Sequence, residues 1–258
     1  MLKKRIIPKF LLKDSRLVKG VKFHDNFREA GNPVSTAKVY DSYGVDELIF
    51  LDIHASVESR KAMADIIEQV SEEVFMPLTA GGGVNTLEDV NRLLSAGADK
   101  VSVNTVAVEQ ADFVKKAAQH FGDQCIVASI DYKEVEPGEF RVFTHGGHTA
   151  TDLDPVEWSM RMQDSHCGEV LLTSIDKDGT MEGYDLEMIN HLSDALTVPL
   201  IASSGAGSLN DCMQAFEAGA SAISISSMFF FTDQSPIKVR SFLSSQGIDV
   251  RASKSSRN

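Results

Sequence analysis

Two clusters of small residues, 122 positions apart, are the part of the chain best suited to do chemistry. Gly81-Gly82-Gly83 and Ser203-Ser204-Gly205 each follow a short apolar run. Asn104-Thr105 and Ser226-Ser227 follow the next such runs at the same offset. Glycine lets backbone N–H groups come close to an anion, and hydroxyl and amide groups add hydrogen bonds. The spacing predicts two phosphate sites at one mouth, and the alternative is that the glycines only form tight turns.

The same offset relates other parts of the chain and indicates an internal repeat. Glu47-Leu48-Ile49-Phe50 returns as Glu169-Val170-Leu171-Leu172. A unit of this size is too long for a solenoid, whose repeats run to about 20–50 residues. We therefore expect two half-barrels within one domain. The expected bounds are 1–258 for the domain, 1–122 and 123–244 for the halves, and 253–258 for a frayed polar tail.

Eight short apolar runs, rich in Val, Ile and Leu, alternate with helical patterns along the chain. Their lack of polar alternation is typical of strands covered on both faces. The runs lie at 5–12, 46–53, 76–80, 99–104, 125–131, 169–175, 198–203 and 221–226. Such alternation, at this length, predicts an α/β fold of the (β/α)8 TIM barrel type. The alternative, a doubly wound open sheet, would not produce two matched halves.

Helical patterns between the runs include those at 58–73, 86–96 and 208–218. One long connection, at 132–152, interrupts the alternation of strands and helices and is expected to form a small excursion over the barrel mouth. His145 and His148 lie in it, but no carboxylate or cysteine nearby completes a metal site. A Gly-rich lid is therefore the favoured interpretation of this segment.

The composition argues against several classes of protein. The formal net charge of −12 disfavours nucleic acid as the main partner, although local loops can still hold a small anion. No apolar run approaches the roughly 18 residues of a membrane span. Cys125, Cys167 and Cys212 are too few and too scattered for a disulfide framework or a zinc site. We expect a cytoplasmic protein with no metal and no other cofactor.

These motifs closely resemble the cyclase subunit of imidazole glycerol phosphate synthase (HisF), nearly end to end. The resemblance is carried by Lys4-Arg5-Ile6-Ile7, Ala80-Gly81-Gly82-Gly83, Gly97-Ala98-Asp99-Lys100-Val101-Ser102, Leu171-Leu172-Thr173-Ser174-Ile175-Asp176 and Asp178-Gly179-Thr180. It implies that ammonia comes from a separate, HisH-like glutaminase subunit on the N-terminal face of the barrel. In that family the ammonia passes along the barrel axis and cyclises a bis-phosphorylated ribulosyl intermediate.

The resemblance assigns roles to two sets of residues. Ammonia is expected to enter through a charged gate formed by Arg5, Glu47, Lys100 and Glu169. Without the resemblance, these four would be interpreted as surface charges near the strand starts. A bis-phosphorylated or phosphosugar ligand is expected at Gly82, Gly83, Asn104, Thr105, Asp178, Gly179, Gly205, Ser226 and Ser227.

The chain departs from the family at one of its two catalytic carboxylates. Asp131, at the end of the fifth strand, matches and is the expected catalytic residue. At the end of the first strand stands Leu11, which cannot transfer a proton. Loss of one acid–base group typically costs about 10²–10⁴-fold in rate. Lys9, two positions earlier, is expected to point into the barrel, where it would pair with Asp131 or narrow the ammonia path.

Three functions remain open. Relatives with an altered first strand are associated with surface-polysaccharide loci, so the first is an ammonia conduit for a sugar amidotransferase that converts acetamido to acetamidino groups. The second is a working cyclase subunit, a lyase of histidine biosynthesis. The third is another phosphosugar enzyme, such as the related isomerase, without a glutaminase partner. Leu11 favours the first of these.

Overall fold

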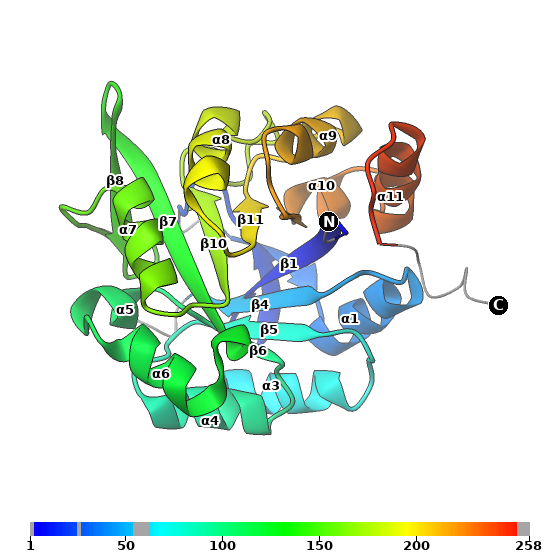
Figure 1. Cartoon of the computed structure of the whole chain (residues 1–258). Coiled ribbons are helices and arrows are strands. Elements are labelled where there is room, and N and C mark those ends of the chain that lie inside the picture. The colour runs from blue at the N-terminus through cyan, green and yellow to red at the C-terminus, as the bar shows by residue number, and fades with distance from the viewer. Residues whose placement is uncertain (1–2, 25–26, 54–61, 252–258) are drawn as a thin grey trace.

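Eight parallel strands close into a barrel in the computed structural model, which describes residues 3–24, 27–53 and 62–251 (Figure 1). The barrel strands are, in order around it, β1 Arg5–Lys13, β4 Leu48–Asp52, β5 Leu78–Gly81, β6 Lys100–Val103, β7 Ile126–Glu136, β10 Glu169–Ser174, β11 Leu200–Ser203 and β12 Ala222–Ile225. β12 pairs with β1 and closes the ring. The predicted (β/α)8 TIM barrel is confirmed.

Helices surround the barrel and cover its strands (Figure 1). They are α1 Pro33–Ser42, α3 Ala62–Ser71, α4 Leu87–Ser95, α5 Thr105–Glu109, α6 Phe113–Phe121, α7 Pro155–Asp164, α8 Leu186–Ala195, α9 Leu209–Glu217, α10 Ser227–Phe231 and α11 Pro236–Ser245, with the 3-10 turn η1 Asp123–Cys125. In the part of the chain that the structure describes, none of them is long and apolar enough to cross a membrane. The expected helix at 58–73 is described from Ala62 on, and the tail at 253–258 lies outside the described residues.

The elements recur at the offset seen in the sequence. β5 and β6 begin 122 residues before β11 and β12, and α4 and α5 begin 122 residues before α9 and α10. Thr86 and Ser208 cap α4 and α9 through the same reciprocal hydrogen bonds with the aspartate three residues on. Asn104 and Ser226 share an unusual backbone conformation, with φ −128° and −134° and ψ −85° and −84°. The two small-residue motifs therefore occupy equivalent places in the barrel.

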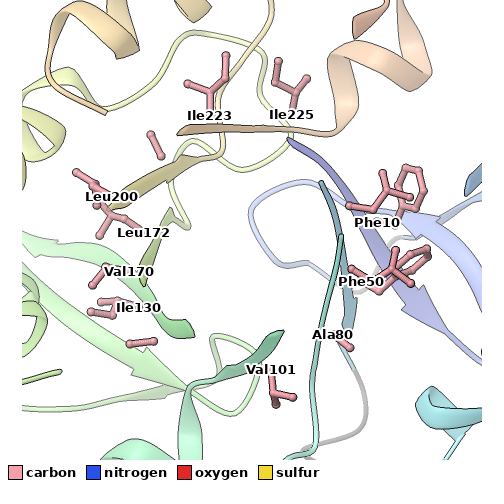
Figure 2. Packing of buried hydrophobic residues seen from close by; sticks show 14 of the residues in the cluster. Phe10, Phe50, Ala80, Val101, Ile130, Val170, Leu172, Leu200, Ile223 and Ile225 are labelled. Carbon is pink, nitrogen blue, oxygen red and sulfur yellow. The ribbon is translucent and has the colours of Figure 1, made fainter. Parts of the chain in front are cut away.

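The wall of the barrel carries one hydrophobic layer outside and another inside, because successive side chains of a strand point to opposite faces. Outer residues such as Phe10, Phe50 and Ile223 point away from the barrel axis, toward the helices (Figure 2). The inner layer is small, and all of its members are fully buried. They are Ile7, Ile49, Val127, Leu171, Ile201 and Ala222. This inner layer separates the two ends of the barrel interior.

Two antiparallel extensions leave the barrel, each after the first strand of one half. β2 Arg16–Lys19 and β3 Arg28–Gly31 follow β1. β8 Glu139–Thr144 and β9 Thr149–Ala150 follow β7, whose far end projects from the barrel with β8 (Figure 1). The second extension was expected from the break at 132–152, and the first was not.

Candidate functional site

Two cavities lie at the C-terminal ends of the strands, where the loops of barrel enzymes hold their sites. Their volumes are about 130 Å³ and about 20 Å³. Every predicted phosphate-binding residue lines one of them. Gly82, Gly83, Asn104 and Thr105 line the larger cavity, Gly179, Gly205, Ser226 and Ser227 line the smaller, and Asp178 lines both. The structure thus brings the predicted set together in two adjoining groups.

Two of the loop glycines have a steric role that needs no ligand. A Cβ on Gly82 would lie 2.1 Å from the carbonyl oxygen of Asp52, and one on Gly205 would lie 2.1 Å from that of Gly183. Both glycines also have positive φ, +100° and +101°. Tight packing of neighbouring loops therefore explains these two glycines by itself. Ser224, on the smaller cavity, has a buried hydroxyl without a partner among the described residues, which leaves a hydrogen-bond donor for an anion.

Asp131, the expected catalytic residue, lines the larger cavity. Asn104 donates its side-chain amide to the Asp131 carboxylate at 2.8 Å. Desolvation raises the pKa of Asp131 to about 6, although the nearby Lys9 acts to lower it. Leu11 lines the same cavity and is 9% exposed, so β1 presents an apolar wall to the site. Strand one therefore supplies no carboxylate at the predicted position.

Lys9 is buried between the two cavities and lines both of them. Its ammonium donates to Ser203 Oγ at 2.7 Å and lies 3.9 Å from Asp178 Oδ1. Ser204 Oγ also donates to Asp178 Oδ1, at 2.8 Å. The Asp178 carboxylate at the two cavities is therefore already engaged, in an ion pair with Lys9 and in a hydrogen bond from Ser204.

Lys19, on β2, is a charged residue of the site that the sequence reasoning missed. Its ammonium donates to the Lys9 carbonyl oxygen at 3.0 Å and also to Ser226 Oγ. It lies 4.9 Å from the centre of the Phe230 ring. A cavity of about 20 Å³ has room for roughly one water molecule. A phosphate beside Ser226 therefore requires Lys19 or its neighbours to move.

Lys19→Met is expected to flatten the pH dependence of stability above neutrality. Desolvation first, and then the charge of Lys9, lower the pKa of Lys19 to about 7, against 10.5 in the unfolded chain. Between these values the unfolded state binds the extra proton, so the stability of the wild type rises with pH. The slope from one such group is at most about 1.4 kcal/mol per pH unit. Urea denaturation across this window should show a smaller slope in the variant, and equal slopes would contradict the burial of an amine there.

The four predicted gate residues contact one another at the N-terminal ends of the strands. Arg5 lies 3.0 Å from Glu47 and 3.0 Å from Glu169. Lys100 lies 2.8 Å and 3.1 Å from the same two carboxylates. Thr79 Oγ1 also donates to Glu47 at 2.5 Å. Cations and anions alternate around this ring, which satisfies the largely buried carboxylates.

The inward-facing residues of β1 show which groups line the barrel interior, from its N-terminal end to its C-terminal end. Arg5 belongs to the charged ring, Ile7 to the inner apolar layer, and Lys9 and Leu11 to the cavities. Glu47 and Glu169 likewise precede their own inner-layer residues by two positions. The charged ring therefore lies directly beneath the apolar layer, and the cavities lie above it.

The loop between β8 and β9 packs over the mouth. The backbone N–H of His145 donates to Thr105 Oγ1 at 3.0 Å, and its ring lies 3.4 Å from Glu109. His148 lines the larger cavity. Gly147 meets Phe23, which belongs to the extension after β1. The predicted lid therefore touches a predicted phosphate-binding residue and closes against the other extension.

Residues 5–235 of the chain match the family model described as Histidine biosynthesis protein. The match begins at the charged ring, takes in all eight barrel strands with both cavities, and ends just before α11. Within the described residues, no group of three or more His, Cys, Asp and Glu side chains is placed to hold a metal ion.

Proposed function

The chain belongs to the Histidine biosynthesis protein family, and from this premise we propose that it receives ammonia from a glutaminase and passes it to a sugar-derived acceptor. The observation that carries the proposal is the first strand. Leu11 lines the larger cavity where a cyclase needs its second proton-transfer group, and Lys9 adds a buried charge beside it. Without this second group, the cyclase reaction is impaired. The charged ring, the apolar layer and the two small-residue loops are all present.

The barrel interior suits a small neutral molecule. The ring of Arg5, Glu47, Lys100 and Glu169 closes the N-terminal end, and the apolar layer of Ile7 and its neighbours lies above it. An ion cannot cross such a layer cheaply, because a charge leaving water loses its solvation. Neutral ammonia carries no such penalty. A glutaminase bound over the ring would deliver it at this point.

The larger cavity supports a phosphosugar as the acceptor. Gly83 and Thr105 offer backbone and hydroxyl groups to a phosphate on one side. Leu11, Leu51 and Phe23 form an apolar wall that would pack against a methyl group, as in an acetamido sugar. A sugar amidotransferase would then complete the conversion of the acetamido to an acetamidino group.

The proposal is tested by mixing the chain with its glutaminase. We expect a complex in sedimentation at micromolar concentrations, and glutaminase turnover that depends on the barrel. Nitrogen from amide-labelled ¹⁵N-glutamine should appear in the sugar product of the full system. Lys38→Met is the control for substitutions in the charged ring, because Lys38 on α1 pairs with Glu73, after α3, in an exposed ion pair that includes no residue of the ring. Absence of a complex would favour a phosphosugar enzyme that works alone.

A working cyclase subunit is the second candidate, and one observation favours it. Asp131 is held by Asn104 at 2.8 Å, beside cavities that keep both small-residue motifs. This arrangement would still bind a substrate with two phosphates. The two candidates differ in whether cyclase activity survives with Leu11 in place of a carboxylate. A substitution at Leu11 therefore distinguishes them best.

A further inference from the structure

The smaller cavity contains a buried hydroxyl that has no hydrogen-bond partner among the described residues. Ser224 is 2% exposed and lines this cavity, and its Oγ bonds to no described group. It comes two positions after Ala222 of the inner apolar layer, so its side chain points into the barrel. A buried hydroxyl without a partner is costly. The geometry therefore leaves a place beside Ser224 for a small group from outside the chain.

The buried ammonium of Lys9 lies beside this hydroxyl. It donates to Ser203 Oγ at 2.7 Å, and Ser203 is the register partner of Ser224 on the neighbouring strand. Adjacent strands of a sheet lie about 5 Å apart. Asp178 Oδ1, at 3.9 Å from the ammonium, is beyond hydrogen-bond distance, so Lys9 keeps N–H groups for a ligand. Two donors thus face the same small space from β1 and β12.

Positive charge exceeds negative charge around the smaller cavity. Among the described residues that line it, Asp178 supplies the one carboxylate, and Lys9 pairs with it. Lys19 lies behind Ser226, and its hydrogen bonds go to neutral oxygens, the Lys9 carbonyl and the Ser226 hydroxyl. Desolvation first, and then the charge of Lys9, lower the pKa of Lys19 to about 7. This direction is expected where a buried cation has no anion of its own.

The hydroxyls that a phosphate would need at this cavity are already used by the chain itself. Ser226 donates to the Lys9 carbonyl oxygen and accepts from Lys19. Ser204 donates to Asp178 at 2.8 Å. The cavity, at about 20 Å³, has room for one water-sized group, whereas a phosphate carries several oxygens around its phosphorus. A single-atom anion therefore fits both the space and the remaining donors better than a phosphate does.

We propose that the smaller cavity binds one halide-sized anion, such as chloride, between the Lys9 ammonium and the Ser224 hydroxyl. The anion satisfies the buried hydroxyl and balances the excess of positive charge. A ligand with two phosphates would have to expel it and move Lys19. The phosphate of the acceptor then lies at the larger cavity, beside Gly83 and Thr105, and this consequence rests on the proposed function. The halide site itself does not depend on that function.

The first test follows the melting temperature of the chain alone against sodium chloride concentration, at an ionic strength held constant with sodium gluconate. The wild type should show a saturable rise, because a ligand that binds only the folded state stabilises it. Ser224→Ala removes one hydrogen bond to a charged ligand and should weaken the apparent chloride affinity by about 10- to 100-fold. Ser159→Ala is the matched control, because Ser159 is also buried but donates to Pro155 within α7. No saturable rise in the wild type, or an equal rise in Ser224→Ala, would overturn the proposal.

Crystals of the wild type soaked in sodium bromide give a second readout that needs no variant. Anomalous scattering should place one bromide within hydrogen-bond reach of Lys9 Nζ and Ser224 Oγ, and inorganic phosphate added to the soak should leave it there. Bromide seen only at exposed lysines would be an adventitious ion only, and that result, or phosphate in place of bromide, would contradict the proposal. Neither test uses the glutaminase or a sugar. Failure of the halide site therefore leaves ammonia delivery untouched, and failure of the glutaminase complex leaves the halide result intact.

Discussion

Leu11→Asp is expected to raise the rate at which free ammonia supports imidazole glycerol phosphate formation by about 10²–10⁴-fold. Each tenfold step corresponds to about 1.4 kcal/mol of transition-state stabilisation. The substitution returns a carboxylate to the end of β1, in the cavity that already holds Asp131, and leaves the small-residue loops unchanged. Turnover of the ribulosyl intermediate with saturating ammonium salt measures the gain.

Leu11→Asn is the matched control, because it has the shape of aspartate without its proton transfer. It should leave the rate at the low level of the wild type. No gain in Leu11→Asp would implicate Lys9, Pro8 or the lid as well, and the double variant with Lys9→Met would then be the next test. A wild-type rate near 1 s⁻¹ or above, an ordinary enzyme value, would rule out the conduit function.

Arg5→Met should destabilise the protein by about 3–5 kcal/mol, the usual cost of removing one partner from a buried ion pair. Arg5 contacts both Glu47 and Glu169, and its loss leaves Lys100 as the sole cation for the two carboxylates in the ring of four. The free energy of unfolding from urea denaturation is the measurement. The same variant is expected to weaken the dependence of glutaminase turnover on the barrel.

Lys38→Met provides the comparison for stability as well. Lys38 and Glu73 are about half exposed, at 52% and 46%, and exposed pairs contribute roughly 0–1 kcal/mol. Equal losses in the two variants would mean that the ring is solvated and open. In that case the four charges would be ordinary surface groups, as their sequence positions alone would have suggested.

The strands and helix caps were predictable because their signals are local. Short apolar runs marked the barrel strands, and Thr86 and Ser208 cap the helices that follow β5 and β11. The constant offset then placed the small-residue loops at equivalent strand ends. The gathering of those loops at one mouth follows from the parallel order of the strands.

The position of Lys19 was not predictable because its strand is short and depends on tertiary contacts. β2 has four residues and pairs with β1 only after the chain turns through Asp14 and Ser15, both at positive φ. Propensity over so few residues is weak. Lys9 was expected inside the barrel, but its contacts with Ser203 and Asp178 depend on the register of β11 and the loop after β10.

Phe23 lies against Gly147, so both halves of the chain border the mouth of the barrel. A Cβ on Gly147 would lie 2.6 Å from the Phe23 ring, so the two extensions touch with no space to spare. They arise after β1 and β7, which hold the same rank in their halves. Phe23 of the first extension and His148 of the second both line the larger cavity, so each half of the chain contributes a segment to its mouth. A single half would carry one small-residue loop and only one of the two extensions that meet at this mouth.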